Sequence, residues 1–219
     1  MAAEQAGAGQ REVVQLAARR PVRVQDVPSP IPVGKAGWRA FADAQLRALT
    51  PPVRKMLVAT LVQEILALAQ KMDVKLVGIY HPIGAEIETR ELANTLLAQG
   101  LLLAYPRVRP DGSGMDFVPC PGPHGLQPRP RSRLMEPPGP ACAPTDLDLL
   151  VVPCVALSGG LVRLGHGAGY FDRYLPQLSP RAPCVGVLPQ CCVLPWQPIE
   201  NHDKSLHLVC TQAGLFGPA

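Results

Sequence analysis

The chain has 219 residues, 47% of them hydrophobic, and its formal net charge is +4 at pH 7. This length suffices for one sizeable α/β domain or two small ones. The small positive charge suits an anionic small molecule but is too weak to indicate nucleic-acid binding, and the most apolar stretch, residues 56–69, is too short to span a bilayer. We therefore expect a monomer that binds small molecules, with neither nucleic acid nor a membrane as its partner.

The seven cysteines are odd in number and include no C-x-x-C pair, so they suggest neither a zinc site nor a disulfide framework. Several lie in apolar surroundings, where a free cysteine behaves as a small hydrophobe, and this usage fits a reducing compartment. The first residues, M-A-A-E-Q, lack the apolar core of a signal peptide. We expect a cytoplasmic protein.

Residues 1–34 are rich in Ala, Gly, Gln, Arg and Pro. Such a composition buries little surface, so we expect residues 1–34 to be a flexible N-terminal extension and residues 35–219 to form the folded domain. Within the extension, Arg11–Arg20 could form a short amphipathic helix, while Glu4 and Glu12 argue against an organellar transit peptide.

Two helices are expected at the start of the domain. Lys35–Leu49 places Trp38 and Phe41 on one apolar side. A second helix begins after Thr50, whose hydroxyl is a candidate N-cap and which is followed by proline in the first turn. Its buried side is predicted from the three- and four-residue spacing of Val53, Leu57, Leu61, Ile65 and Leu68.

Strands then alternate with a helix. Leu76–Tyr80 and Leu101–Tyr105 are predicted to be short strands. The helix between them spans Thr89–Gln99, with Thr89 as its candidate cap and Gly100 as its terminator.

The second half of the chain begins irregularly and then resumes the alternation. Residues 106–145 are dense in proline and glycine, which predicts a long surface excursion with one short strand near residues 115–118. Leu147–Leu157 is the predicted central strand. The remaining predicted elements are a helix beginning at Tyr170 and limited by Pro176, and strands at Cys184–Leu188 and Leu206–Thr211. This order predicts an α/β fold, a single compact domain whose mainly parallel central sheet is flanked by helices.

A dense motif, L-G-H-G-A-G-Y-F-D-R-Y, spans Leu164–Tyr174 just past the central strand, where open α/β sheets place ligands. Its glycines permit positive φ, and successive backbone N–H groups can form an anion-binding concavity. Arg163 and Arg173 offer forked donors to phosphate, and the carboxylate of Asp172 can hold Mg²⁺. The G-x-G-x-G spacing alone fits a flexible surface turn equally well. The density of charged and aromatic residues favours a nucleotide-binding, Gly-rich loop with a metal ligand beside it.

The stretch Val152–Leu175 resembles the signature of the 5-formyltetrahydrofolate cyclo-ligase family, roughly V-P-G-x-A-F-D-x-x-G-x-R-L-G-x-G-x-G-Y-Y-D-R, and the resemblance continues from about Lys35 to Thr211. It implies an enzyme that uses ATP and Mg²⁺ to cyclise 5-formyltetrahydrofolate, with or without a polyglutamate tail. The product is 5,10-methenyltetrahydrofolate, formed through a phosphorylated formyl group with release of ADP and phosphate.

The resemblance also implies residue roles. Arg163 and Tyr170 would be catalytic. The implied ATP-binding residues are Lys35, Arg39, Arg163, Leu164, Gly165, His166, Gly167, Ala168, Gly169, Tyr170, Phe171 and Arg173. Folate would be bound by Glu86, Met115 and Tyr170, and the metal by Asp172 and by Asp203 of the closing Asn201-His202-Asp203 block.

Several of these residues also have a plainer interpretation. Lys35 and Arg39 would suit a solvated helix face. Glu86 and Glu88 precede a predicted helix, whose dipole would favour acidic residues at that end. His166 is equally an ordinary loop histidine.

The signature is not complete, because Ser158, Leu161 and Phe171 stand where the family has Asp, Gly and Tyr, and Cys154 replaces a Gly. These departures leave open a second hypothesis, a non-catalytic folate- or nucleotide-binding protein on the same fold. A third, a nucleic-acid-associated module that uses the basic extension, is disfavoured by the modest charge.

Overall fold

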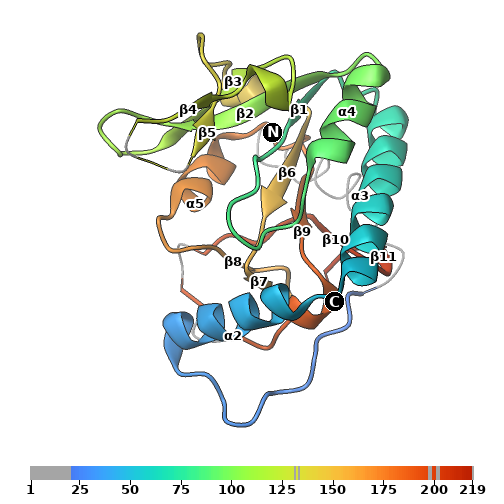
Figure 1. Ribbon diagram of the computed structural model, residues 1–219, viewed down its shortest axis with the longest axis vertical. Coiled ribbons are helices and arrows are strands. Elements are labelled where there is room, and N and C mark those ends of the chain that lie inside the picture. Colours follow the sequence, from blue (N-terminus) through green and yellow to red (C-terminus); the bar gives the residue numbers. More distant parts are fainter. Residues whose placement is uncertain (1–20, 131, 133, 197–198, 201–202, 219) are drawn as a thin grey trace, which may run out of the picture.

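The computed structural model describes residues 21–130, 132, 134–196, 199–200 and 203–218. Within these residues the chain forms one central sheet with helices packed on both of its faces (Figure 1). The predicted helix at Arg11–Arg20 and the Asn201-His202 pair lie outside the described residues.

The central sheet has seven strands in the order β11-β10-β9-β6-β1-β2-β3. Their bounds are Leu76–Gly78 (β1), Leu102–Val108 (β2), Met115–Pro119 (β3), Leu149–Pro153 (β6), Cys184–Val187 (β9), Leu208–Thr211 (β10) and Gly214–Phe216 (β11). The inner strands pair in parallel, while β3 and β11 add to the edges in antiparallel fashion. The predicted α/β class with a mainly parallel sheet is therefore confirmed, and β11 is a strand that the sequence did not predict.

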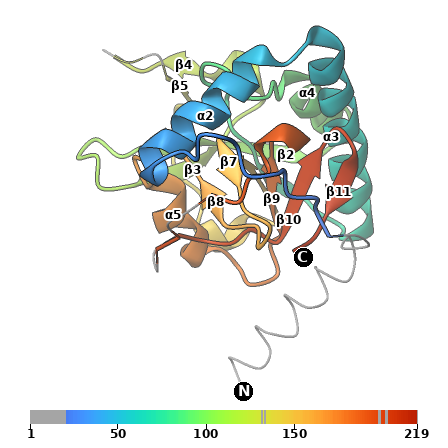
Figure 2. The same cartoon turned by 90° about the horizontal axis from the view of Figure 1, so that it is seen from below.

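The α-helices are α2 (Gly34–Ala48), α3 (Pro51–Lys71), α4 (Arg90–Ala98) and the short α5 (Tyr170–Tyr174). Helices α3 and α4 lie along one face of the sheet, where α3 contacts β10 and α4 contacts β2 (Figure 1). Helix α5 lies on the other side and packs on β3. Figure 2 shows α2 crossing the end of the molecule beside β7, which it contacts.

The predicted apolar faces of the first two helices are confirmed. Trp38 and Leu46 are buried on α2, and the central leucines and isoleucine of α3 are buried completely. Gly100 ends α4 with a φ of +80°, which is the left-handed conformation expected of a helix terminator.

Both predicted threonine caps are wrong in their mechanism. Thr50 occupies the N-cap position of α3, but its side chain makes no cap hydrogen bond. The two prolines that follow are part of the cause. A cap oxygen accepts a hydrogen bond from the N–H of the second or third helical residue, and Pro52, the second, has no N–H. Thr89 likewise leaves α4 uncapped, since its buried hydroxyl donates to the carbonyl of Tyr80 at 2.7 Å.

The predicted central strand at 147–157 is two strands. β6 lies between β1 and β9 and ends at Pro153, and Ala156–Leu157 (β7) then pairs with Arg163–Leu164 (β8) in a separate hairpin. Proline has no N–H to donate, so the ladder stops there. The glycine loop therefore does not follow β6 directly, because the β7–β8 hairpin lies between them in the chain.

The excursion at residues 106–145 has more structure than its composition predicts. β2 extends to Val108 and pairs with the whole of β3. Two further strands, Gln127–Pro128 (β4) and Met135–Glu136 (β5), form a small separate hairpin. Hydrogen-bonded pairing between strands orders this segment, and composition alone cannot predict such pairing.

The part of the predicted extension that the structure describes, residues 21–34, is not a free tail. Val22 is 3% exposed within the core, and the N–H of Gln25 donates to the carbonyl of Val193 at 2.8 Å. Pro21 bridges to Gly217 beside the last strand. Most of residues 21–34 are nevertheless exposed, including Val27, Ile31 and Val33. The flexible extension and the domain boundary at residue 34 stay predictions.

In the described part of the chain, no helix combines the length and the apolarity needed to cross a membrane. All seven cysteines lie in that part and are free thiols. Burial raises the pKa of Cys154 to about 12, so this thiol stays protonated at neutral pH and serves as a packing group.

Candidate active site

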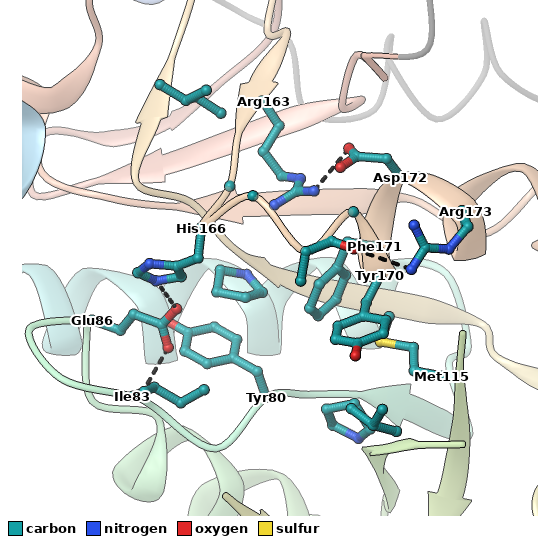
Figure 3. A pocket seen from close by; sticks show the side chains of 18 of the residues that line it. Tyr80, Ile83, Glu86, Met115, Arg163, His166, Tyr170, Phe171, Asp172 and Arg173 are labelled. Carbon is teal, nitrogen blue, oxygen red and sulfur yellow. Dashed lines mark hydrogen bonds and ion pairs between the residues drawn. The ribbon is translucent and has the colours of Figure 1, made fainter. Parts of the chain in front are cut away.

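A cavity of about 740 Å³ opens where the glycine loop meets α2 and the carboxyl ends of β1 and β6 (Figure 3). This volume is typical of a small-molecule site. It brings together every residue that the sequence assigned to a site: Lys35, Arg39, Glu86, Met115, Arg163, Leu164, Gly165, His166, Gly167, Ala168, Gly169, Tyr170, Phe171, Asp172, Arg173 and Asp203.

Local sterics dictate the glycines of the loop. A Cβ on Gly165 would collide with the guanidinium of Arg163, so only glycine lets that side chain fold back beside the loop. Gly169 has a φ of +69°, which side chains rarely adopt, and this turn starts α5 at Tyr170. The motif therefore fixes its own backbone.

Arg163 is the most deeply placed charge of the cavity wall, only 5% exposed. Its Nη2 donates to Oδ1 of Asp172 at 2.8 Å, and its guanidinium lies 5.5 Å from the ring centroid of Phe171. Its Nε is buried without a hydrogen-bond partner among the described residues. A buried donor in this state favours an added acceptor from a ligand.

Helix α2 brings two more cations to the cavity. The Nζ of Lys35 lies 2.8 Å from Asp203 and 2.9 Å from Glu200. Burial by itself lowers the pKa of Lys35, but the hydrogen bonds and charges of the two carboxylates outweigh it and raise the pKa, so the ammonium is retained. Arg39 donates from Nε to the carbonyl of Gly165 at 2.8 Å, which ties α2 to the glycine loop. These side chains are not a solvated helix face.

Arg173 closes the other end of the loop. It donates to the carbonyls of Ser113 and Ala168, both at 3.1 Å, and its guanidinium lies 5.3 Å from the ring centroid of Tyr170. The arginine thus joins α5, its own loop and the turn before β3, and it orients the ring of Tyr170 along the cavity wall (Figure 3).

The two carboxylates before α4 have separate environments. Glu88 accepts from the N–H groups of Thr89 and Arg90, so it is the acidic residue at the helix start. Glu86 instead lines the cavity and accepts from the N–H of Ile83 at 2.8 Å and from Nε2 of His166 at 2.9 Å. The hydrogen bond to Glu86 raises the pKa of His166.

Mostly apolar residues form the remaining wall, together with a few polar ones, and most of them escaped the sequence analysis. The additional lining residues include Tyr80, His81, Ile83, Leu134, Met135, Pro153 and Lys204. Tyr80 and Pro153 stand at the carboxyl ends of the β1 and β6 region, so the rule for ligand sites in parallel sheets could have identified them. Phe117, two residues after Met115, does not line the cavity and is buried against Phe171 and Tyr174.

The donor set suits a divalent cation only in part. Asp172 and Asp203 both line the cavity, and each already faces a cation of the protein. Over the residues that the structure describes, no three His, Cys, Asp or Glu side chains gather as a ready metal site. Mg²⁺ is commonly held by one or two carboxylates together with substrate phosphates and water. The residues present fit Mg²⁺ in that manner, with phosphate completing the ligand set.

Comparisons with known proteins agree on one family. A sequence model of the 5-formyltetrahydrofolate cyclo-ligase family matches residues 33–212. The chain is 27% identical over 185 residues to the 5-formyltetrahydrofolate cyclo-ligase of Mus musculus, which covers 78% of this chain and 90% of the mouse protein. It is 31% identical over 155 residues to the protein of the same name from Mycolicibacterium smegmatis, covering 66% and 78% of the two chains.

The fold of the chain also resembles that of a solved structure. The 5,10-methenyltetrahydrofolate synthetase of Aquifex aeolicus aligns with a TM-score of 0.72 at 25% identity, and the alignment covers 84% of this chain and 92% of that one. The family match includes every residue that lines the cavity.

Proposed function

The chain belongs to the 5-formyltetrahydrofolate cyclo-ligase family, and from this membership we propose that its cavity holds ATP and 5-formyltetrahydrofolate for one reaction. The protein is an ATP-dependent ligase that closes 5-formyltetrahydrofolate to 5,10-methenyltetrahydrofolate and releases ADP and phosphate. One observation carries the residue assignment: a single cavity gathers the glycine loop, the cations of α2 and the carboxylate of Glu86.

The two substrates divide the cavity by charge. The phosphates of ATP lie along the glycine loop, where backbone N–H groups, Lys35, Arg39 and Arg163 offset their negative charge. The pterin ring lies between Glu86 and Met115, because a carboxylate in a partly apolar wall matches the paired N–H donors of a pterin edge. The observations in support are the Lys35 side chain, which is only 16% exposed, and the cavity-facing carboxylate of Glu86.

The reaction has two balanced steps. The formyl oxygen attacks the γ-phosphorus of ATP, ADP leaves, and the formyl group becomes a phosphorylated iminium. The second folate nitrogen then attacks the activated carbon, loses its proton, and phosphate departs with the former formyl oxygen as the ring closes. The protein contributes mainly by holding the two substrates in line and by stabilising the moving charge.

Arg163 and Tyr170 are the proposed catalytic residues. Arg163 lies in a desolvated position where a guanidinium donor stabilises charge on a transferring phosphoryl group more strongly than it would in water. The Tyr170 hydroxyl lies near the reacting formyl group and orients it through a hydrogen bond. Arg173, stacked on Tyr170, keeps that ring in place.

Magnesium is proposed to enter with the nucleotide. Asp172 and Asp203 would hold it together with phosphate oxygens, and the ion would supply charge neutralisation between the phosphates. Phosphate that arrives beside Arg163 and Lys35 shares their donors, so the two aspartates are then available as metal ligands.

The departures from the family signature are accommodated close to the site. Leu161, where the family has glycine, adopts a φ of +55° and is fully buried. Ser158 accepts from the N–H of Val162 at 3.1 Å and so holds the same turn. Arg163 keeps its ion pair with Asp172 beyond this turn, and Phe171 supplies a ring beneath the guanidinium in place of a tyrosine. These contacts support catalysis over the alternative of a non-catalytic binding protein.

The direct test mixes the purified chain with ATP, Mg²⁺ and 5-formyltetrahydrofolate and follows the near-ultraviolet absorbance of the methenyl product. We expect a rise that needs all three components, accompanied by release of ADP in equal amount. No rise, together with a folate-dependent increase in melting temperature, would favour the non-catalytic protein. Controls that omit ATP, folate or metal in turn identify which component is dispensable.

A further inference from the structure

One contact joins the two halves of the cavity. His166 stands in the middle of the glycine loop, and its Nε2 lies 2.9 Å from Oε1 of Glu86, which is 80 residues away in the sequence. The histidine is 58% exposed, whereas the side chain of Glu86 is only 5% exposed. Figure 3 shows the imidazole standing over the carboxylate at the mouth of the cavity.

Both oxygens of the Glu86 carboxylate have a partner in this arrangement. Its Oε2 accepts from the backbone N–H of Ile83 at 2.8 Å, and its Oε1 faces His166. A pterin ring presents two neighbouring N–H donors, so its recognition by a carboxylate needs both oxygens aimed at the ring. A carboxylate oxygen can accept a second hydrogen bond, so the Ile83 N–H leaves Oε2 able to accept from the ring, whereas the imidazole of His166 competes with the second pterin donor for Oε1.

We propose that His166 is a latch on the folate carboxylate: in the free protein it holds Oε1 of Glu86, and it must let go before 5-formyltetrahydrofolate can bind. This inference rests on the proposed function, because it takes Glu86 as the residue that binds the pterin. His166 is a positioning residue here, since it acts on folate through Glu86. Its exposure leaves it room to swing outward, while the backbone N–H of Ile83 keeps Glu86 in place.

The charges around the latch make its strength depend on pH. The hydrogen bond to Glu86 is the largest cause of the raised pKa of His166; desolvation lowers it, Asp43 on α2 adds to the rise, and Arg163 on β8 opposes it. Arg39 also lies nearby, with its guanidinium beside Gly167.

The sign of the effect follows directly. Below the raised pKa, the latch is an ion pair between a charged imidazolium and the carboxylate. As the pH rises through that pKa, the imidazole loses its charge and the latch weakens. Folate affinity should therefore increase with pH, because the fraction of protein with an open carboxylate sets the apparent dissociation constant.

The test measures the dissociation constant of 5-formyltetrahydrofolate without ATP, by titration calorimetry between about pH 6 and 8.5, a range that brackets the ordinary histidine pKa. For the unchanged chain we expect the constant to fall about fivefold across this range, the size of effect that an ion pair of about 1 kcal/mol produces. His166→Ala should bind folate tightly at every pH, without the slope. His166→Gln, which keeps a neutral donor, should also lose the slope but bind somewhat more weakly than His166→Ala.

His81→Ala is the matched control. His81 also lines the cavity, but it has no hydrogen bond or ion pair with the other described residues, so this variant should keep the slope of the unchanged chain. A slope that persists in His166→Ala, or a loss of folate affinity in that variant that is equal at every pH, would overturn the latch. Failure of the unchanged chain to bind folate at any pH would instead overturn the proposed function on which the latch depends.

Discussion

The buried face of α3 is apolar throughout, whereas the wall of the cavity combines apolar side chains with charged ones. Along α3, Leu57, Leu61 and Ile65 are buried completely against the sheet and carry no polar atoms in their side chains. The cavity wall instead gathers three ion pairs, Arg163–Asp172, Lys35–Asp203 and His166–Glu86, each with at least one partner largely removed from solvent.

The difference separates stability from function. Burying one aliphatic side chain contributes about 1.5–3 kcal/mol to folding. A buried ion pair contributes little or is unfavourable relative to apolar residues of the same volume, because its charges lose their hydration. The charges of the cavity are therefore better explained by a ligand than by the fold, and substitutions in the two regions should have different consequences.

The largest effect is expected from Arg163→Ala. Loss of a desolvated donor at the transferring phosphoryl group should lower kcat by about 100- to 1,000-fold. The free energy of unfolding should also decrease, because Asp172 loses its cation. Activity at saturating ATP and folate, combined with urea unfolding, measures both quantities.

The matched control for that variant is Arg109→Ala. Arg109 is also held by a carboxylate, Asp116 at 2.8 Å, but it is more exposed and lies outside the cavity lining. It should retain near-normal kcat. If Arg163→Ala lost no more activity than Arg109→Ala, the catalytic assignment of Arg163 would be refuted.

Leu61→Ala should show the reverse behaviour. Truncation of a fully buried leucine removes about 2–5 kcal/mol of stability, since a cavity remains in the core. The kcat of the folded fraction should not change, because Leu61 is not part of the cavity lining. Met56→Ala, at an exposed position of the same helix, is the control and should unfold at nearly the same urea concentration as the unchanged chain. Equal losses in the two variants would contradict the core assignment.

Lys35→Ala tests the proposed position of the ATP phosphates in the cavity. Removal of a charge-assisted contact with phosphate should raise the KM for ATP about tenfold, equivalent to about 1.4 kcal/mol, and should leave the KM for folate nearly unchanged. Arg47→Ala removes an exposed cation from the same helix, whose partner is Asp43 four residues earlier. A change in the folate KM larger than that in the ATP KM would argue against the proposed orientation of the two substrates.

The smallest effects distinguish two threonines at helix starts. Thr89→Ala should cost about 1 kcal/mol of stability, because its buried hydroxyl bonds the carbonyl of Tyr80. Thr50→Ala should cost less than about 0.5 kcal/mol, because Thr50 is exposed and makes no cap hydrogen bond. Chemical unfolding of both variants tests this order, and a larger loss for Thr50→Ala would show that the proline-rich start of α3 is capped in solution after all.

Local sequence patterns were sufficient to predict those features that depend on residues close to one another in the sequence. The apolar spacing of α3, the glycine that ends α4 and the glycine loop were all identified from the sequence, since each depends on residues within a few positions. Position after a strand also predicted where the cavity lies. The sequence misjudged the strand at 147–157, because it could not show that the ladder stops at Pro153 and that β7 pairs elsewhere.

The roles of the two acidic residues before α4 show the limit most clearly. By residue type and position before a helix, Glu86 and Glu88 are equivalent carboxylates, and only the family resemblance singled out Glu86. The fold gives Glu88 to the helix N–H groups and turns Glu86 into the cavity towards a histidine 80 residues later. Apart from the family resemblance, no periodicity or capping pattern within the local segment carries that distinction.

The amino-acid sequence by itself determined the α/β class, the helices and the residues of the glycine loop, because periodicity, glycine sterics and proline chemistry act over one or two turns of chain. Only the tertiary structure decided which charges meet. Lys35 reaches Asp203 across 168 residues, Pro21 bridges to Gly217, and Gln25 donates to the carbonyl of Val193. Such contacts depend on the complete sheet, since its strand order sets which distant loops share one edge.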